Sequence, residues 1–311
     1  MTDFALLAAP SDWQPGFRQR LIDAYRATGL PEPAVAEFAT SVMELSGGDW
    51  TAAAILDEDG RRVGQVVVGV AERDGDLVGR IGDLWTDPAL DPDQDGQATH
   101  RRAAHAWARR WCQEQGATKV WVRLAAPDEE FADYPVRAQT RIKVITTPAE
   151  PPAGVTHRPI TEAEFPAWQA AGQQRYAADM VRAGSRTPEE AQEQAEKDYH
   201  RLLPEGLATP DTTLLVLEAD GQVIGNGWLR HRHLPGVTYG YSLVVHPEFR
   251  GRGHGRTAMA VGEQATRAAG DQVLMFNVFG GNEVAMSLYT AVGYRVLEEA
   301  RSLDLTPSAD N

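Results

Sequence analysis

A loop rich in glycine and arginine follows a short apolar segment near residue 245. The apolar segment, residues 243–245, is followed by Pro247, and residues 250–256 then alternate glycines with basic residues. Glycines let a backbone approach an anion closely, and a helix that begins after the loop directs free N–H groups and its positive end to the same place. Arg250 and Arg252 add two positive charges. The pattern predicts a phosphate-binding loop between a strand and a helix.

A second chemical pattern begins at Asn282. Asn282 precedes a helical pattern that carries Tyr289 near its end, and Gly293 follows. Asparagine is a favoured first cap of a helix, and glycine is the usual stop. A turn rich in glycine and arginine is by itself often only a solvated loop, but the two patterns in this order are more specific.

A dinucleotide-binding loop is the competing interpretation. Residues 253–258 fit the pattern G-x-G-x-x-A. That fingerprint belongs in a tight turn directly after a strand, within a series of βαβ units. Here Pro247 and several further residues separate strand and fingerprint, and only one such unit follows. The context therefore argues against a dinucleotide site.

The two patterns resemble the GNAT superfamily of acetyl-CoA-dependent acyltransferases. The family signature, Arg/Gln-x-x-Gly-x-Gly/Ala, matches residues 250–255, which read Arg-Gly-Arg-Gly-His-Gly. The resemblance is clear over residues 211–305 and extends less securely back to residue 155. It implies an N-acetyltransferase (an acyltransferase of class EC 2.3.1) that moves acetyl from acetyl-CoA, a co-substrate, directly to a primary amine of a small molecule.

The resemblance also implies which residues bind the donor. In this family the loop amides bind the CoA pyrophosphate, and backbone groups of the preceding strand bind the pantetheine arm. The expected donor-binding residues are Leu243, Val244, Val245, Arg250, Gly251, Arg252, Gly253, His254, Gly255, Arg256, Asn277, Asn282, Ala285 and Tyr289.

Catalytic roles follow for three residues. The family resemblance places the thioester carbonyl near the backbone N–H of Val245, which would stabilise the oxyanion. Tyr289 is expected to protonate the leaving thiolate, because a phenol of pKa about 10 is protonated at neutral pH. Many relatives carry a carboxylate on the strand before the loop, but residues 239–244 contain none. Tyr241, Asn277 or a water chain would then assist loss of the amine proton, unless the amine arrives neutral.

The sequence contains an internal repeat. Segments with an Asp-Gly turn at residues 57–60 and 218–221, and strands ended by Pro88 and Pro247, recur at an offset of about 160 residues. Residues 148–154 are rich in proline and alanine and are typical of a linker. We therefore expect an α/β (α+β) protein of two tandem GNAT-like domains, each a mixed, mostly antiparallel twisted sheet flanked by helices. Their predicted bounds are residues 1–147 and 155–311.

The first copy is expected to be degenerate. Gln94, Gly96 and Ala98 only loosely match the loop signature, and aspartates stand where the second copy has arginines. Like charges near 4 Å repel by about 4 kcal/mol at an effective dielectric of 20, so carboxylates would oppose a pyrophosphate. We expect the first domain to be structural or to shape the acceptor site, and the second to be catalytic.

Composition restricts the class of protein. The 311 residues include 44 acidic and 30 basic ones, for a formal charge of −14, which opposes binding to nucleic acid. There is one cysteine, no apolar run of membrane-spanning length and no signal-peptide pattern at the N-terminus. We expect a cytoplasmic protein, monomeric or homodimeric, with no metal and no membrane or nucleic-acid partner.

The acceptor is the least specified part. By family resemblance it lies against residues 173–182 and the acidic helix expected at residues 188–199, whose carboxylates either attract a cationic amine or only face solvent. Mycothiol synthase has a similar size and organisation and is one alternative, and a peptide or protein N-acetyltransferase is another. A non-catalytic acyl-CoA sensor is a third, motivated by the missing strand carboxylate.

Overall fold

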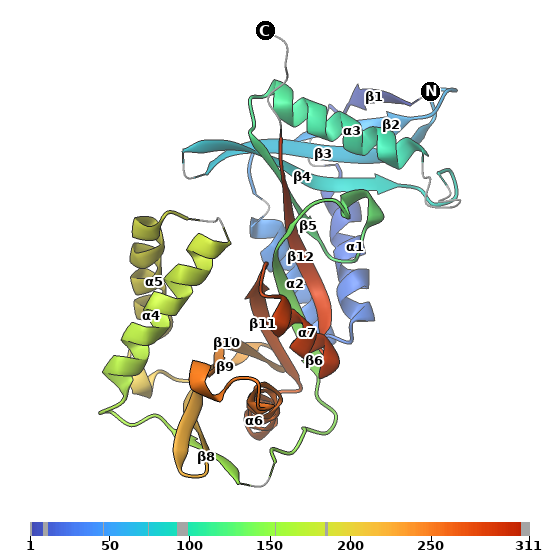
Figure 1. Cartoon of the computed structure of the whole chain (residues 1–311). Helices are drawn as coiled ribbons and strands as arrows, with labels where there is room; N and C mark the ends of the chain where they lie inside the picture. The colour runs from blue at the N-terminus through green and yellow to red at the C-terminus, as the bar shows by residue number, and fades with distance from the viewer. Residues whose placement is uncertain are drawn as a thin grey trace. The chain divides into compact units, whose positions relative to one another are not determined.

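The computed structural model describes residues 2–8, 12–45, 47–73, 75–91, 99–152, 154–183 and 186–305. The chain forms two compact units (Figure 1). Unit 1 comprises residues 1–25, 36–137 and 298–311, and unit 2 comprises residues 26–35 and 138–297. The loose loop motif of the first copy (Gln94, Gly96 and Ala98) lies outside the described residues.

Unit 1 is a mixed sheet flanked by helices. Its strands follow the order β1-β2-β3-β4-β5-β12, and neighbours are antiparallel except for the parallel pair β4 and β5. The elements are β1 (Asp3–Leu6), α1 (Gln14–Ala27), α2 (Glu32–Leu45), β2 (Thr51–Leu56), β3 (Arg62–Arg73), β4 (Asp76–Thr86), α3 (Thr99–Glu114), β5 (Lys119–Leu124) and β12 (Arg295–Asp304).

Helix α3 covers the sheet of unit 1 with its small residues. Ala104, Ala108 and Cys112 recur every four residues and are fully buried, so they form one face of the helix. A Cβ at Gly79 of β4 would lie 2.6 Å from the Cys112 sulfur, so the glycine lets the helix pack closely on the strand. The side chains of this face pack on buried residues of β3, β4 and β5.

The strands of unit 2 follow the order β6-β11-β10-β9-β8-β7. Its pairs are antiparallel except for β10 and β11, which are parallel. The elements are β6 (Val136–Val144), β7 (Val155–Pro159), α4 (Phe165–Arg182), α5 (Pro188–Leu202), β8 (Thr212–Ala219), β9 (Gln222–Leu234), β10 (Val237–Val245), α6 (His254–Ala268), β11 (Val273–Phe279) and α7 (Glu283–Ala291).

The strands of the two units share one plan. Residues 78–81 of β4 pair in parallel with β5, and residues 237–240 of β10 pair in parallel with β11. Directly after each parallel segment comes one extra residue, Gly82 in β4 and Tyr241 in β10, which forms a β-bulge against the antiparallel neighbour. Both predicted Asp-Gly hairpins are present, as β2–β3 and β8–β9. The predicted fold class, mixed sheets flanked by helices and repeated within the chain, is confirmed.

Each unit is completed by a strand from the other half of the sequence. The last strand, β12, pairs with β5 of unit 1, whereas β6 from the first half pairs with β11 of unit 2. Glu298, on β12, is buried and accepts hydrogen bonds from Tyr25 and from Nε of Arg123, the latter at 2.8 Å. Because each unit contains strands from both halves of the sequence, the predicted domain boundary at residues 148–154 stays a prediction about where the sequence repeat divides.

Helices α4 and α5 of unit 2 pack against one another. A Cβ at Gly172 of α4 would clash with the Tyr199 hydroxyl, so this glycine sets how closely the helices approach. Helix α5 begins with a capping box in which Thr187 and Glu190 satisfy each other's backbone N–H groups. Across the described residues, none of the helices has the length and apolar character needed to span a membrane.

Candidate active site

The parallel strands β10 and β11 of unit 2 part in the middle of the sheet. Their pairing covers residues 237–240 and ends at the bulge residue Tyr241. A bulge bends its strand and increases the local twist, which separates the strand from its neighbour on the other side. Residues 241–245 of β10 consequently face a gap with the edge of the backbone open, although they lie in the interior of the sheet.

A cavity of about 1410 Å³ passes through this region. Most pockets for drug-sized ligands measure about 300–1,000 Å³, so this one has room for two molecules. The predicted residues that line it are Tyr241, Leu243, Val244, Val245, Arg250, Gly251, Gly253, Gly255, Arg256, Asn277, Asn282, Ala285 and Tyr289. Arg252 and His254 do not line it, and the guanidinium of Arg252 instead lies 5.8 Å from the ring centre of Phe249.

The predicted phosphate loop has the backbone that this function needs. Gly251 and Gly253 have φ values of 75° and 86°, in the left-handed region where a Cβ is unfavourable. Gly253 is the first cap of α6, and no side chain there bonds to the first amides of the helix. The positive end of a fifteen-residue helix is thus presented at the cavity between two arginines that line it, Arg250 and Arg256.

The backbone of Val245 faces the gap. The N–H of the next residue, His246, donates to the Ile224 carbonyl at 2.9 Å on the β9 side. Because N–H and C=O groups of successive residues alternate between the two edges of a strand, those of Val245 point to the β11 side. Consistently, Nε of Arg250 donates to the Val245 carbonyl at 3.0 Å. The N–H predicted to stabilise the oxyanion is therefore directed into the gap.

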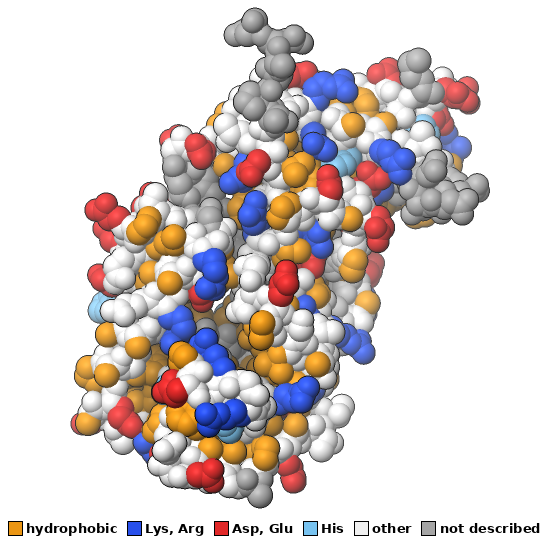
Figure 2. Space-filling view, viewed as in Figure 1, with side chains coloured by type: hydrophobic (Ala, Val, Ile, Leu, Met, Phe, Trp, Pro, Cys, Tyr) orange, Lys and Arg blue, Asp and Glu red, His pale blue; other side chains and the backbone are white. Residues whose placement is uncertain are grey.

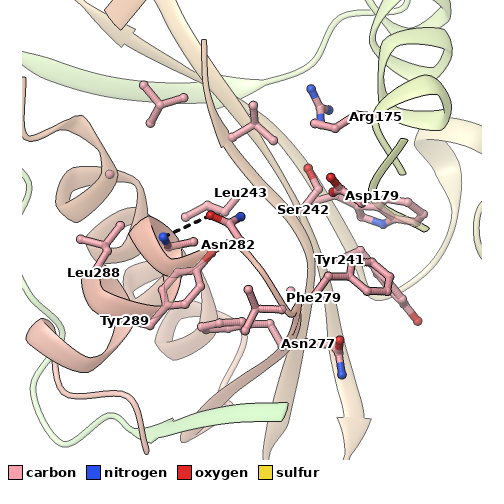
Figure 3. Close-up of a pocket in the computed structure, with 18 of the residues that line it drawn as sticks. Arg175, Asp179, Tyr241, Ser242, Leu243, Asn277, Phe279, Asn282, Leu288 and Tyr289 are labelled. Carbon is pink, nitrogen blue, oxygen red and sulfur yellow. Dashed lines mark hydrogen bonds between the residues drawn. The ribbon is translucent and has the colours of Figure 1, made fainter. Parts of the chain in front are cut away.

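Helix α7 brings Asn282 and Tyr289 to the same side of the sheet (Figure 3). The Asn282 side chain accepts from the Ala285 N–H at 3.2 Å and so caps the helix, as predicted. The ring of Tyr289 lies 4.5 Å from that of Phe276 on β11. Burial raises the pKa of Tyr289, and the charge of Arg141 only partly opposes it. The phenol therefore stays protonated at neutral pH, as a proton donor must.

The other side of the cavity has an aromatic wall. Trp228 lies between Tyr199 of α5 and Tyr241 of β10, with ring centres 4.9 and 4.6 Å away, and Tyr239 continues the row 4.9 Å beyond Tyr241. Ser242 pairs with Trp228 and so shares this face, whereas Leu243 packs with α6 residues on the opposite face. Burial raises the pKa values of Tyr239 and Tyr241. Neither phenol ionises readily enough to act as a base at neutral pH.

The sequence pointed to the acidic helix that carries Asp198 but did not single out the other charged residues of this wall. Helices α4 and α5 contribute Arg175, Asp179, Arg182, Asp198 and Arg201. Four of them lie in the two segments predicted to meet the acceptor, but nothing in the sequence indicated which side chains face inward. Figure 3 shows Arg175 and Asp179 on the side of the strands opposite Leu288 and Tyr289.

The acidic helix α5 turns most of its carboxylates to solvent. Glu189, Glu193 and Glu196 are exposed, and Glu190 belongs to the capping box. Only Asp198 lines the cavity. Burial opposes its ionisation, but hydrogen bonds from Arg201, Gln194 and Tyr176 outweigh this and hold its pKa below the ordinary value. The helix is thus mainly a solvated acidic face.

The corresponding region of unit 1 is occupied by its own side chains. The Asp91 carboxylate accepts from the N–H groups of His100 and Arg101 at 3.2 and 2.9 Å, at the beginning of α3. The Arg101 guanidinium donates to the Leu84 carbonyl at 2.5 Å and to Asp128. Leu84 is the repeat counterpart of Leu243, so protein groups occupy the helix amides and strand carbonyl that unit 2 leaves open.

The described part of the chain contains no cluster of three or more His, Cys, Asp or Glu side chains suited to a metal ion. The side chains and amides that line the cavity of unit 2 instead suit a long donor with phosphate groups at one end. An open strand edge can form hydrogen bonds with amide groups of a ligand, and the glycine loop with its arginines can bind phosphate groups.

Comparison with known proteins agrees with this geometry. The model of the acetyltransferase (GNAT) family matches residues 177–294, which include the loop, the gap and α7. The uncharacterized N-acetyltransferase YdgE of Bacillus subtilis is 30% identical over 138 residues, which cover 43% of this chain and 88% of YdgE. A mycothiol acetyltransferase of Kytococcus sedentarius is 29% identical over 148 residues, 47% of each protein.

The likeness in fold extends beyond this region. The crystal structure of a GCN5-related N-acetyltransferase from Sphaerobacter thermophilus is 17% identical, with a TM-score of 0.53, and the match covers 100% of this chain and 98% of that one. At this identity the match speaks for the fold alone. With the extensive match to YdgE, it leads to one conclusion: the chain belongs to the GNAT family of acetyltransferases, acyltransferases that use acetyl-CoA.

Proposed function

We propose that unit 2 transfers acetyl from acetyl-CoA directly to the primary amine of a small molecule. The observation that carries the proposal is the gap between β10 and β11, which joins two chemically different halves of one cavity. The half beside α6 and α7 has the glycine loop, and the half beside α4 and α5 has the aromatic wall and charged side chains. A donor and an acceptor that enter from opposite faces would meet at Val245.

The donor half suits acetyl-CoA over its length. The amides that begin α6, with Arg250 and Arg256, would hold the pyrophosphate. The open edge of β10 at Leu243 would pair with an amide of the pantetheine arm, as an added strand does. The arm then ends with its thioester at the gap, between the Val245 N–H and the Tyr289 phenol.

The chemistry would be a direct attack. The neutral amine forms a bond to the thioester carbonyl carbon, and the Val245 N–H stabilises the resulting oxyanion. As the carbon–sulfur bond breaks, Tyr289 gives its proton to the departing thiolate. Asp179, on α4, is the lining carboxylate that we propose accepts the amine proton through water, with Tyr241 as a hydrogen-bonding partner.

Unit 1 would not bind a donor. Asp91 places a carboxylate at the amides of α3, where a pyrophosphate would need to bind, and Arg101 takes the strand carbonyl. Displacing both groups would break an ion pair between Arg101 and Asp128. We propose that this unit is structural, and that acetyl-CoA binds once per chain.

Calorimetric titration with acetyl-CoA and measurement of thiol release with a panel of primary amines test the proposal together. We expect one binding site and amine-dependent release of free CoA. Arg250→Ala should weaken donor binding about tenfold or more, since it removes charge-assisted contacts. Arg252→Ala is the matched control, because Arg252 does not line the cavity and should change affinity much less. Equal losses in both variants, or binding without release across the panel, would count against the proposed enzyme.

A mycothiol-acetyltransferase-like activity is the second candidate. The relative from Kytococcus sedentarius supports it, although the match covers under half of each protein. Including the acceptor of that relative in the amine panel separates the two candidates. A clear preference for it would replace the small-amine proposal. Peptide amines belong in the same panel, and tight donor binding without turnover would favour an acyl-CoA sensor.

A further inference from the structure

The acceptor half of the cavity is cationic, in contrast to the chain as a whole. Helices α4 and α5 place three arginines and two aspartates in its wall. Arg182 is paired with Asp179, and Arg201 with Asp198 at 2.9 Å. Among the residues that the structure describes, Arg175 has no hydrogen bond or ion pair. One positive charge is thus left over, although the chain carries a net charge of −14.

Arg175 is half-buried, and its charge acts on the aromatic wall. Burial raises the pKa of the neighbouring Tyr199 to about 12, and the charge of Arg175 works in the opposite direction. A guanidinium that is partly withdrawn from water and unpaired is electrostatically unfavourable, and an anion that bonds to it removes that cost. Figure 2 shows Lys and Arg side chains bordering a hollow in this face of the molecule, and Figure 3 shows Arg175 beside the cavity.

We propose that the acceptor is an amino carboxylate, with Arg175 binding its carboxylate group while its amine reaches the gap. This inference rests on the proposed acetyl transfer and specifies its substrate class. Planar guanidinium groups match carboxylates with two parallel hydrogen bonds. The charges of the wall, three arginines and two aspartates, leave one positive charge, which matches the single negative charge of an amino carboxylate in its reactive form with a neutral amine.

The rest of the wall defines the other parts of such a substrate. Trp228, Tyr239 and Tyr241 form an apolar surface, which suits an aromatic or branched aliphatic side chain. Asp179 lies on the same helix as Arg175, one turn further along, and would meet the ammonium form of the amine before it loses its proton. Acetylation removes the charge of the amine and keeps the carboxylate, so the product would lose its contact with Asp179 and keep that with Arg175.

Matched pairs of amines test the inference. Phenylalanine and 2-phenylethylamine differ only in the carboxylate, as do leucine and 3-methylbutylamine. We expect wild-type kcat/KM to favour the carboxylate member of each pair by about 10- to 100-fold, the contribution typical of hydrogen bonds to a charged group. In Arg175→Gln that preference should collapse. Lys197→Gln, which removes a cation of α5 that does not line the cavity, should retain it.

A binding measurement separates failure of this inference from failure of the proposed function. Quenching of tryptophan fluorescence reports occupation of the wall through Trp228, with or without turnover. Carboxylate-dependent binding that Arg175→Gln abolishes supports the inference even if no amine is acetylated. If both members of each pair bind and react equally in the wild type, the inference is refuted while acetyl transfer stands. A stronger response to O-phosphoethanolamine than to either amino acid would also overturn it.

Discussion

Gly253 provides a quantitative test of the proposal that the loop binds the donor. Its φ of 86° places it in the left-handed region, and a Cβ added to it would meet no heavy atom within 4 Å. Replacement by alanine therefore adds no steric clash with neighbours and changes only the backbone preference. The left-handed conformation costs an L-residue about 1–2 kcal/mol relative to glycine. That cost must lower the free energy of unfolding, weaken donor binding, or be divided between the two.

The division depends on whether the rest of the protein keeps the loop in place without a ligand. If it does, Gly253→Ala lowers the free energy of unfolding by about 1–2 kcal/mol and leaves affinity for acetyl-CoA nearly unchanged. If the free loop relaxes, stability is kept and affinity falls roughly 5- to 30-fold. Urea unfolding and calorimetric titration with acetyl-CoA measure the two parts, and their sum should match the cost.

Gly270 supplies the matched control. It follows the other end of α6, has a φ of 88°, and likewise leaves a Cβ free of heavy atoms within 4 Å. It does not line the cavity, so Gly270→Ala should lose stability alone. Gly253→Asn should lose less than Gly253→Ala, since asparagine tolerates the left-handed region. If Gly253→Ala changes neither stability nor affinity, the loop does not bind the donor in the conformation described.

Three further outcomes are expected. Tyr289→Phe should lower kcat about 100-fold or more with little change in donor affinity, and an unchanged kcat would remove the phenol from the mechanism. Because burial raises the pKa of Tyr289, the kcat of the wild type should not fall as the pH rises from about 7 to 10. Calorimetry should give one acetyl-CoA per chain, and a second site would contradict the occupation of the unit 1 region by Asp91 and Arg101. Burial lowers the pKa of His105 from 6.5 to about 4, so the stability that its neutral form contributes is complete above pH 6.5 and is lost as the pH falls through 4. The free energy of unfolding of His105→Gln, measured in urea, should lack this acid-dependent loss. A pH profile identical to that of the wild type would show that His105 is not its source.

Short local motifs predicted most of the residues that line the proposed donor half of the cavity. Glycines at alternating positions beside arginines, an asparagine cap and a tyrosine near a helix end are signals carried by a few neighbouring residues. The structure brings these residues to one cavity, apart from the side chains of Arg252 and His254. Those two were included because the motif is contiguous in sequence, but the direction of a loop side chain depends on contacts that a motif does not specify.

The acceptor half was predictable only as a region. The segments that form α4 and α5 were expected to face the acceptor, yet Arg175 was not distinguished from the other arginines of its helix. Whether a charged side chain faces solvent or a cavity depends on how its helix packs against its neighbours, and the close approach of α4 and α5 is set by Gly172 and Tyr199, which are far apart in the sequence. The bulge at Tyr241 was likewise invisible, because an extra residue in a strand is defined by the register with its partner.

The exchange of β6 and β12 between the two halves of the sequence has a consequence for how the protein is made. When the ribosome has synthesised the first half of the chain, the sheet of unit 1 still lacks β12, whose Glu298 satisfies Tyr25 and Arg123 in the interior. Neither half of the sequence, expressed by itself, would contain all the strands of one unit. The two repeats are therefore obliged to mature together, near the end of translation, and a fragment cut at the sequence repeat would be a poor substitute for the enzyme.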